Sequence, residues 1–587
     1  MRALDALLTP PGRLHAACAR GARLAAVMLA LACFALPSFT HADGAEPDRD
    51  AGGRALPPEV PDDPPGKPAQ AVAGAKAAAT ITFGRFTSVQ VNVSPTGANI
   101  AGDAANEPSI AVDPTDHSRM AIGWRQFDTI ASNFREAGYA FTTDNGATWT
   151  KSKIDPGVFR SDPVLDVSSG GAFFYNSLNG NNLNSTVYPS GDGGATWGTG
   201  VFAYGGDKQW MTIDKGSSSG AGFQYQAWST ASNPFAPNTF NRSPDGGGSW
   251  QAPWTIPSSP IWGTLAVASD GTLYVAGMSG GTNYVARSTN AKNAGATPTF
   301  TVTSVNLGGS IRLGGPNPAG LCGQIWIGVD RSNGPRAGWV YLLASVQTPN
   351  DPVDVMFSRS TDGGQTWSNP VRVNDDTPGN HAWQWFGTMS VAPDGRLEAV
   401  WNDTRASADS SMSALYYSYS LDGGVTWSAN EQASPVWNSR VGWPNQQKIG
   451  DYYHMVSDTN GADLAWSATF NGEEDVYYLR IPRVGSAFVG DPGSGFGLHA
   501  AIPNPFASST TIGFEMPPGG GHAKLAVYDV TGRRVATLID DVVSGGPHLA
   551  RWSGIMSETG DQAPAGVYMC RLEGVGHVEK CRIVRLR

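Results

Sequence analysis

Acidic, basic, amide and aromatic side chains recur at two kinds of position in this 587-residue sequence. One kind lies at the start of a short apolar segment typical of a strand, and the other lies where the next such segment ends. The first kind includes Asn106, Glu107, Asp162, Asp207, Gln384, Trp385, Asp451 and Tyr452, and the second includes Trp124, Arg125, Trp401, Asp403 and Arg405. Carboxylates can transfer protons, arginines bind anionic groups, and indole rings stack on sugars. These residue types indicate a sugar site.

Two other interpretations fit the same residues. Acidic and basic side chains near strand starts can neutralise one another, as Asp403 and Arg405 would. Alternatively, a ring of carboxylates would suit Ca²⁺, which prefers oxygen ligands, although no cofactor is required. That ring would consist of Glu107, Asp162, Asp207 and Asp451. The histidines are too scattered for a zinc motif.

One eight-residue pattern identifies the elements that must position these residues. It reads Ser/Thr, any, Asp, any, Gly, any, Ser/Thr, Trp, and it occurs at 142–149, 190–197, 243–250, 360–367 and 420–427. Its aspartates are Asp144, Asp192, Asp245, Asp362 and Asp422. In a tight turn the carboxylate accepts backbone N–H bonds and the glycine takes positive φ, so we expect structural turns that do no chemistry.

These turns divide the middle of the chain into seven repeated units. The first strand of each unit is predicted at 109–112, 163–166, 210–213, 265–267, 325–329, 386–391 and 452–456. The seventh unit lacks an outer strand, which residues 81–93 can supply, so that the N-terminal strand closes a ring. The sequence therefore predicts an all-β chain with a seven-bladed, alternatively six-bladed, β-propeller at 81–484.

The eight-residue pattern resembles the Asp-box, or bacterial neuraminidase repeat, of sialidases and related propellers. The resemblance implies an arginine triad, for which Arg125, Arg405 and Arg312 are candidates, and a tyrosine nucleophile, for which Tyr452 is the candidate. It also implies catalytic carboxylates, here Glu107, Asp162 or Asp207. Substrate contacts would come from Trp124, Trp385, Trp401 and Gln384. Sialidases have six blades and an Arg-Ile-Pro element ahead of the first repeat, whereas here Arg480-Ile481-Pro482 follows the last one.

The two ends of the chain indicate export. Residues 1–42 have the basic, apolar and small-residue regions of a signal peptide, and 43–80 and 485–498 read as linkers, the first of them disordered. Residues 499–587 resemble the C-terminal sorting domain of type IX secretion substrates, an Ig-like sandwich that would engage secretion machinery. Within it, Cys570 and Cys581 would face each other across a hairpin and are candidates for a disulfide.

A net charge of -10 without a basic cluster argues against nucleic acid, and no apolar stretch in the mature chain is long enough to span a membrane. Together these features predict a secreted or surface-displayed protein that binds or acts on extracellular glycan or glycoprotein. It would be a retaining exo-glycosidase of sialidase type or, alternatively, a non-catalytic propeller that binds carbohydrate or protein.

Overall fold

The computed structural model describes residues 49–50, 52–55, 63–65, 78–180, 183–231, 233–483, 496–502, 504–507, 509–517, 519–557 and 559–586. The predicted signal peptide, most of the first linker and residues 485–495 of the second lie outside these ranges. The described part of the chain is all-β, and no helix in it is long and apolar enough to cross a membrane.

Seven antiparallel sheets follow one another between residues 78 and 483. In the first five of them, strands that are consecutive in sequence are neighbours in the sheet. The first sheet contains β3 (Ala104–Val112), β4 (Met120–Phe127), β5 (Glu136–Thr142) and β6 (Thr150–Ile154). The second contains β7 (Arg160–Val167), β8 (Phe173–Asn179), β9 (Asn184–Ser190) and β10 (Val201–Phe202). The third contains β11 (Trp210–Ile213), β12 (Gln224–Ala227) and β13 (Phe240–Ser243).

The fourth and fifth sheets contain β14 (Leu265–Val267), β15 (Leu273–Ser279), β16 (Thr282–Ser288) and β17 (Thr301–Val305); and β20 (Trp326–Val329), β21 (Val340–Val346), β22 (Asp354–Ser360) and β23 (Val371–Arg372). A hairpin of β18 (Leu313–Gly314) and β19 (Asn317–Leu321) lies between them in sequence. The sixth contains β24 (Gln384–Val391), β25 (Leu397–Asp403), β26 (Met412–Ser420), β27 (Glu431–Gln432) and β28 (Trp437–Asn438).

The seventh sheet joins the two ends of this region. It contains β29 (His454–Asp458), β30 (Gly461–Ala468) and β31 (Asp475–Pro482), and then β2 (Phe86–Gln90) and β1 (Thr80–Phe83). Strand β2 pairs antiparallel with β31, with Val89 opposite Tyr478. The N-terminal strand therefore completes the last sheet, as the sequence predicts.

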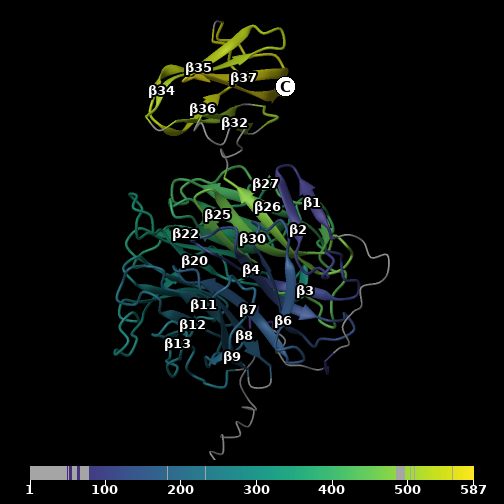
Figure 1. Cartoon of the computed structure of the whole chain (residues 1–587), viewed down its shortest axis with the longest axis vertical. Helices are drawn as coiled ribbons and strands as arrows, with labels where there is room; N and C mark the ends of the chain where they lie inside the picture. The colour runs from purple at the N-terminus through teal and green to yellow at the C-terminus, as the bar shows by residue number, and fades with distance from the viewer. Residues whose placement is uncertain are drawn as a thin grey trace, which may run out of the picture. The chain divides into compact units, whose positions relative to one another are not determined.

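The first strands of the seven sheets close a ring around a central axis (Figure 1). Each contacts the next in the order β3, β7, β11, β14, β20, β24 and β29, and β29 contacts β3 again. The large apolar side chains fill the spaces between neighbouring sheets, where Trp401, Trp466 and Tyr477 are completely buried. This arrangement is a β-propeller.

The five eight-residue repeats form turns with the same hydrogen bonds. In the fifth sheet Asp362 accepts bonds from the backbone N–H of Thr366 at 2.9 Å and from its hydroxyl at 2.6 Å. Ser360 donates to the same carboxylate at 2.7 Å and accepts from Gly364, whose φ is +87°. The same bonds recur at Asp144, Asp192, Asp245 and Asp422. Each turn is thus held by its own side chains.

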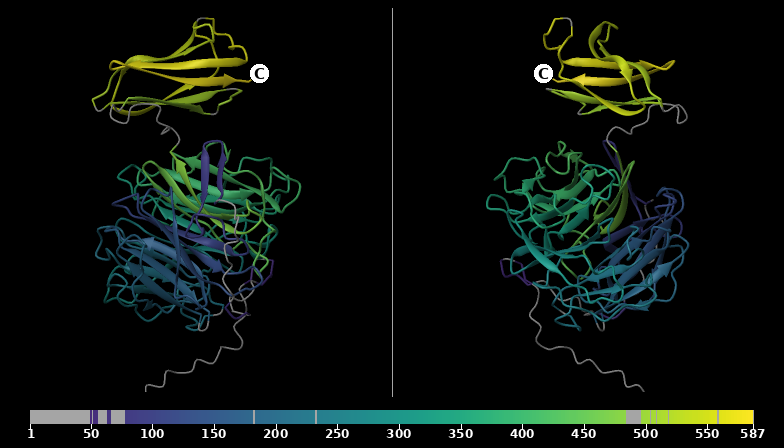
Figure 2. Two further views of the ribbon diagram at one scale, coloured as in Figure 1. Left: turned by 45° about the vertical axis from the view of Figure 1, so that its right-hand side comes forward. Right: turned by 90° about the vertical axis from the view of Figure 1, so that its left-hand side faces the viewer.

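The C-terminal residues form two sheets that pack face to face (Figure 2). One contains β32 (Gly497–Ile502), β33 (Thr510–Met516) and β36 (Gly546–Trp552), and the other contains β35 (Arg534–Val543), β34 (Gly521–Tyr528), β37 (Gly566–Gly574) and β38 (His577–Arg585). Cys570 lies directly opposite Cys581 in the β37–β38 ladder, and both are free thiols in this structure.

The described parts of the first predicted linker make specific contacts with the propeller. The carboxylate of Asp50 accepts a bond from the backbone N–H of Leu313, and Arg54 donates to the Leu313 carbonyl at 3.0 Å. Asp63 and Asn133 exchange two bonds, at 2.8 and 3.1 Å. Leu313 begins β18, and Asn133 lies in the loop between β4 and β5; both connections are on the face where the first strands begin, so these described residues lie against that face.

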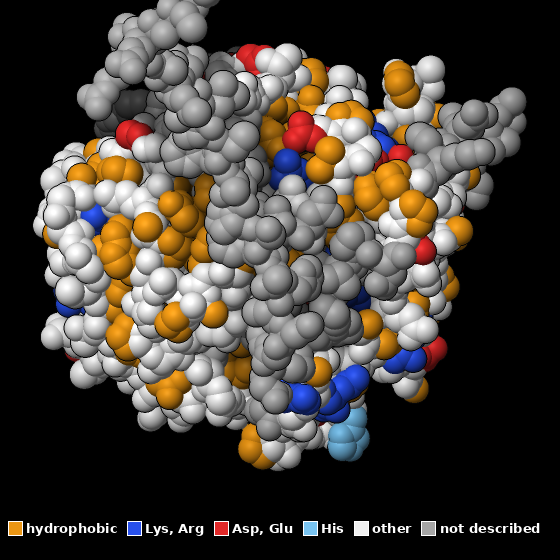
Figure 3. Space-filling model, turned by 90° about the horizontal axis from the view of Figure 1, so that it is seen from below, with side chains coloured by type: hydrophobic (Ala, Val, Ile, Leu, Met, Phe, Trp, Pro, Cys, Tyr) orange, Lys and Arg blue, Asp and Glu red, His pale blue; other side chains and the backbone are white. Residues whose placement is uncertain are grey.

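Charged side chains are sparse on the face of the molecule drawn in Figure 3. The Lys and Arg side chains and the Asp and Glu side chains of the described residues occur there in small groups, separated by uncharged ones. Over that face the charge is patchy and not of one sign.

Candidate functional site

Left-handed backbone positions the charged residues at the starts of the first strands. Glu107, Asp162 and Lys208 have φ of +52°, +47° and +56°, a region that non-glycine residues rarely adopt. The β3–β4 ladder shifts register between Asn106 and Ser109, and the β7–β8 ladder shifts between Ser161 and Val164. Such bulges change the direction of a side chain. Here the three affected side chains belong to one buried cluster.

This buried cluster contains four carboxylates and three cationic side chains, all less than one-tenth exposed. Its members are Glu107, Asp162, Asp207, Asp451, Arg125, Lys208 and Lys448. The Nζ of Lys208 lies 2.8 Å from Oδ2 of Asp451, and the Nζ of Lys448 lies 2.7 Å from the same oxygen. We call this group the axial charge cluster. It brings together the four predicted carboxylates with Arg125.

The loops above the axial charge cluster seal it from solvent. The backbone N–H of Leu321, at the end of the β18–β19 hairpin, donates to Oδ1 of Asp451 at 2.8 Å. The side chain of Asn317 donates to the Gly450 carbonyl at 2.8 Å and accepts from the N–H of Ile449 at 3.0 Å. A hairpin inserted between the fourth and fifth sheets is thereby fastened to the loop before the seventh.

Burial sets the protonation of the cluster. It raises the pKa of Glu107 to about 7, against the opposing effects of Arg125 and Lys448. No described residue donates a hydrogen bond to either oxygen of that carboxylate. Burial alone would also raise the pKa of Asp451, but Lys208 and Lys448 hold it well below its usual range. Near neutral pH the cluster therefore has one carboxyl group that can gain or lose a proton and one that stays ionised.

Tyr452, the candidate nucleophile, lies next to the cluster but does not have the surroundings of a nucleophile. Its hydroxyl donates to the backbone carbonyl of Pro163 at 2.8 Å, and the side chain is buried. Burial, with the nearby charges of Glu107 and Asp162, raises its pKa well above the ordinary value. An activated tyrosine needs a base within hydrogen-bonding distance, and here the hydroxyl bonds to a carbonyl instead.

The ring of carboxylates does not fit the predicted Ca²⁺. The ammonium of Lys208 lies 2.8 Å from Asp451, 3.7 Å from Asp162 and 3.8 Å from Asp207, so it occupies the place that a shared cation would take. Elsewhere in the described residues, His117, Asp458 and Asp463 form a group of metal-ligand type. Arg480 bonds both aspartates at 2.8 Å and already neutralises them.

Trp124, Trp385 and Trp401, the three predicted stacking tryptophans, are completely buried within the sheets. Their indole N–H groups bond to Gln126, Ser413 and Asp403 at 2.9, 3.0 and 2.9 Å. These tryptophans alternate with polar residues on strands that are buried on both faces. For this reason the sequence does not distinguish an indole ring inside a sheet from one at the propeller axis.

The three candidate arginines do not converge. Arg125 belongs to the axial charge cluster, with Nε 3.3 Å from Oε2 of Glu107 and 2.8 Å from the side-chain Oδ1 of Asn106, to which it donates. Arg312 stacks on the ring of Trp383, with 4.7 Å between the guanidinium and the ring centroid. Arg405 belongs to a third group of residues. The predicted triad is therefore absent among these side chains, since each arginine has its own partners.

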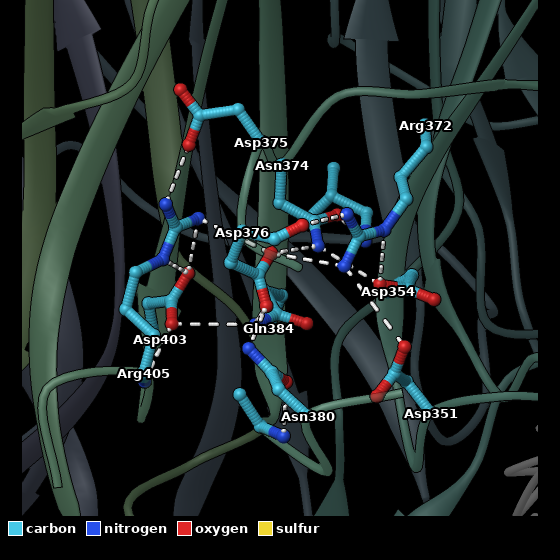
Figure 4. Close-up of polar contacts among 12 residues, drawn as sticks. Asp351, Asp354, Arg372, Asn374, Asp375, Asp376, Asn380, Gln384, Asp403 and Arg405 are labelled. Carbon is cyan, nitrogen blue, oxygen red and sulfur yellow. Dashed lines mark hydrogen bonds and ion pairs between the residues drawn. The ribbon is translucent and has the colours of Figure 1, made fainter. Parts of the chain in front are cut away.

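Arg405 belongs to an ion-pair network between the fifth and sixth sheets (Figure 4). It lies 2.6 Å from Asp375 and 2.8 Å from Asp403, and Asp376 bridges it to Arg372. The amide of Gln384, also predicted as a substrate contact, is buried here and donates to Asp376 and Asp403 at 3.2 and 3.3 Å. This network corresponds to the mutual neutralisation that Asp403 and Arg405 suggested in the sequence.

An open pocket of about 430 Å³ lies beside this network. Its polar lining consists of Asn380, His381, Thr404, Arg405, Ser407 and Ser410, and we call it the 380–410 pocket. Amide, hydroxyl, imidazole and guanidinium groups of this kind can bond the hydroxyls of a sugar. His381, Thr404 and Arg405 stand at positions that the strand pattern marks, whereas Asn380, Ser407 and Ser410 lie in loops of ordinary composition.

Sequence comparisons found no related protein, and the structural comparison found solved structures of low similarity. No protein-family model matches the chain, and no match was found among curated proteins. Among solved structures, the phage phi92 endosialidase has 10% identity and a TM-score of 0.38, covering 77% of this chain and 74% of its own. The Trypanosoma rangeli sialidase has 11% identity and a TM-score of 0.31, with 86% and 87% covered.

The GH74 xyloglucanase from Xanthomonas campestris has 13% identity and a TM-score of 0.31, with 87% of this chain and 92% of that one covered. These three structures are an endosialidase, a sialidase and a xyloglucanase, all at low sequence identity to this chain. At such scores the likeness carries no argument about catalytic residues.

Proposed function

We propose that this protein binds extracellular glycan, or glycoprotein through its glycan, and does not hydrolyse it. The observation that carries the proposal is the contrast between two places on the propeller. The candidate catalytic groups Tyr452, Glu107 and Asp162 are buried beneath fastened loops. The 380–410 pocket, on the same face, is open and has room for one or two sugar rings.

The charges around the 380–410 pocket favour an uncharged sugar. Arg405 is the only arginine or lysine in its lining, and Asp375 and Asp403 lie within 2.8 Å of its guanidinium. A carboxylated sugar would have to compete with these two aspartates. Hydroxyl groups, in contrast, can bond to Asn380, Ser407 and Ser410 without displacing any ion pair.

The C-terminal sandwich and the N-terminal sequence support export. We propose that residues 1–42 are removed as a signal peptide and that the sandwich at 499–587 is recognised by secretion machinery of type IX kind. The propeller would then act as a secreted or surface-attached binding module.

A retaining exo-glycosidase of sialidase type is the second candidate. The raised pKa of Glu107, about 7, is the feature that favours it, since a general acid needs its proton near neutral pH. For catalysis the β18–β19 hairpin would have to leave the axial charge cluster.

A glycan array probed with the mature chain tests the binding proposal. Ala408 is exposed in the lining of the pocket, so Ala408→Trp fills the pocket without removing a polar contact. Ala337, exposed in another loop, provides the matched control Ala337→Trp. We expect binding of neutral glycans that Ala408→Trp abolishes and Ala337→Trp preserves. Binding unaffected by Ala408→Trp would exclude this pocket, and no binding to any glycan would refute the proposal.

A further inference from the structure

A second cavity lies on the propeller axis, on the other side of an aromatic layer from the axial charge cluster. Its volume is about 160 Å³, and the first strands of six sheets line it. The rings of Trp210 and Trp326 meet edge to face at 5.1 Å, and His454 lies 5.4 and 5.5 Å from them. Tyr452 packs on the other side of Trp210 at 5.2 Å. These rings form the inner end of the cavity.

The three rings present hydrogen-bond donors to the cavity. Nδ1 of His454 accepts from the backbone N–H of Ile110 at 3.3 Å, so the neutral ring carries its proton on Nε2. Burial lowers the pKa of His454 to about 4, which keeps the ring neutral at ordinary pH. No described residue accepts a hydrogen bond from this Nε2 or from the indole N–H of Trp210 or Trp326. All three side chains are lining residues.

Hydroxyl groups on the walls add donors. Oγ1 of Thr264 accepts from the backbone N–H of Ile327 at 3.0 Å, and Oγ of Ser390 accepts from Ser457 at 2.8 Å. Each hydroxyl proton is therefore left for another acceptor. The side chains of Thr264 and Ser390 both line the cavity.

The outer end of the cavity is cationic. Lys215 and Arg331 follow the ends of β11 and β20 and line the opening. Asp166 is the only carboxylate in the lining, and its oxygens already accept from Ile213, Val167 and Lys215, the last at 2.5 Å. Arg331 is exposed and has no ion-pair partner among the described residues. Lys215 balances Asp166, so one positive charge remains.

We propose that this axial cavity binds a small oxyanion, such as inorganic phosphate, sulfate or a short carboxylate. The indole, imidazole and hydroxyl groups described above offer donors, the one carboxylate in the lining is already bonded, and the lining side chains carry a net positive charge. An anion can accept charge-assisted hydrogen bonds from several of these donors at once. The volume admits a group of a few heavy atoms but not a sugar chain. This site is independent of the 380–410 pocket and of the glycan proposal.

Isothermal titration calorimetry of the mature chain with phosphate, sulfate and acetate in separate titrations tests the site. We expect saturable binding of at least one oxyanion, and the three titrations distinguish a mineral anion from a carboxylate. Arg331→Gln should weaken that binding about tenfold, because a charge-assisted bond is lost. Trp210→Phe, which removes one N–H and keeps a smaller aromatic ring, should weaken that binding about fivefold. Arg119→Gln, which removes an arginine outside the lining, should leave it unchanged.

A crystal soaked in selenate then locates the anion by its anomalous signal. Density between Trp210, Trp326 and His454 would support the proposal. No saturable binding, binding that Arg331→Gln and Trp210→Phe leave unchanged, or selenate found elsewhere on the surface would each overturn it.

Discussion

Lys208 should be among the residues on which the stability of the propeller depends most. Its ammonium is completely buried and lies 2.8 Å from Asp451 and within 3.8 Å of Asp162 and Asp207. Removal leaves four carboxylates with two cations. Breaking a buried ion pair from one side typically costs about 3–5 kcal/mol, since the remaining charge stays buried. We therefore expect Lys208→Met to lower the free energy of unfolding by about 3–5 kcal/mol.

Urea unfolding followed by tryptophan fluorescence measures this change. The signal reports the propeller, because Trp552 is the only one of the 19 tryptophans in the C-terminal module. Lys292→Met is the control. That ammonium bonds the Asp270 backbone carbonyl at the surface, so its loss should cost less than about 1 kcal/mol.

A double-mutant cycle with Asp451→Asn separates the ion pair from mere loss of packing. We expect the Lys208→Met/Asp451→Asn chain to be more stable than the sum of the single losses predicts, by about 2 kcal/mol. The stability deficit of Lys208→Met should also shrink as the pH falls, because protonation neutralises the carboxylates that the lysine no longer balances. A loss below about 1 kcal/mol, or strict additivity in the cycle, would refute the reasoning.

Three further predictions concern other charged and sulfur-containing groups. The pKa of Glu107 is about 7 in the folded protein, against an ordinary value of 4.5, so the folded state binds more protons than the unfolded state between these values. The free energy of unfolding should therefore fall as the pH rises from about 4.5 to 7. In urea titrations, Glu107→Gln should remove this fall. Hydrogen bonds led by that of the Thr366 hydroxyl lower the pKa of Asp362 to about 2, so its contribution should be lost as the pH falls from 3.8 to about 2. Asp362→Ala should cost about 1–2 kcal/mol at neutral pH, and an unchanged unfolding midpoint would contradict the role of the turn. In the oxidised chain, Cys570 and Cys581 should form a disulfide, seen by mass spectrometry as the loss of two hydrogens and one remaining thiol in the mature chain.

The fold was predictable because its signal repeats along the chain. Each eight-residue turn carries its own hydrogen-bonding groups, and an apolar strand pattern recurs at a fixed place before it. The last unit lacked an outer strand, and the apolar segment at 81–93 had no unit of its own, so the sequence predicted that they pair. In the structure β2 pairs with β31. The residues within each repeat were enough to predict these features of the fold.

The site was predictable only in part, because burial is a property of the assembled ring. Glu107, Asp162, Asp207 and Asp451 do come together, as equivalent positions in a ring must. Nothing in the sequence shows that a hairpin between two sheets covers them. Lys448 was missed as well, because it lies in a loop outside the strand pattern. Hence the sequence alone could not separate a catalytic group from a structural one.

The most direct test of the account is the release of 4-methylumbelliferone from its sialoside and from a panel of other glycosides. It requires the mature chain and a correctly folded Tyr452→Phe variant. The account predicts no turnover of any substrate by either protein, because Tyr452 and its neighbouring carboxylates are sealed from solvent. Turnover by the wild-type chain that Tyr452→Phe abolishes would contradict it and establish a hydrolase whose site opens at the propeller axis.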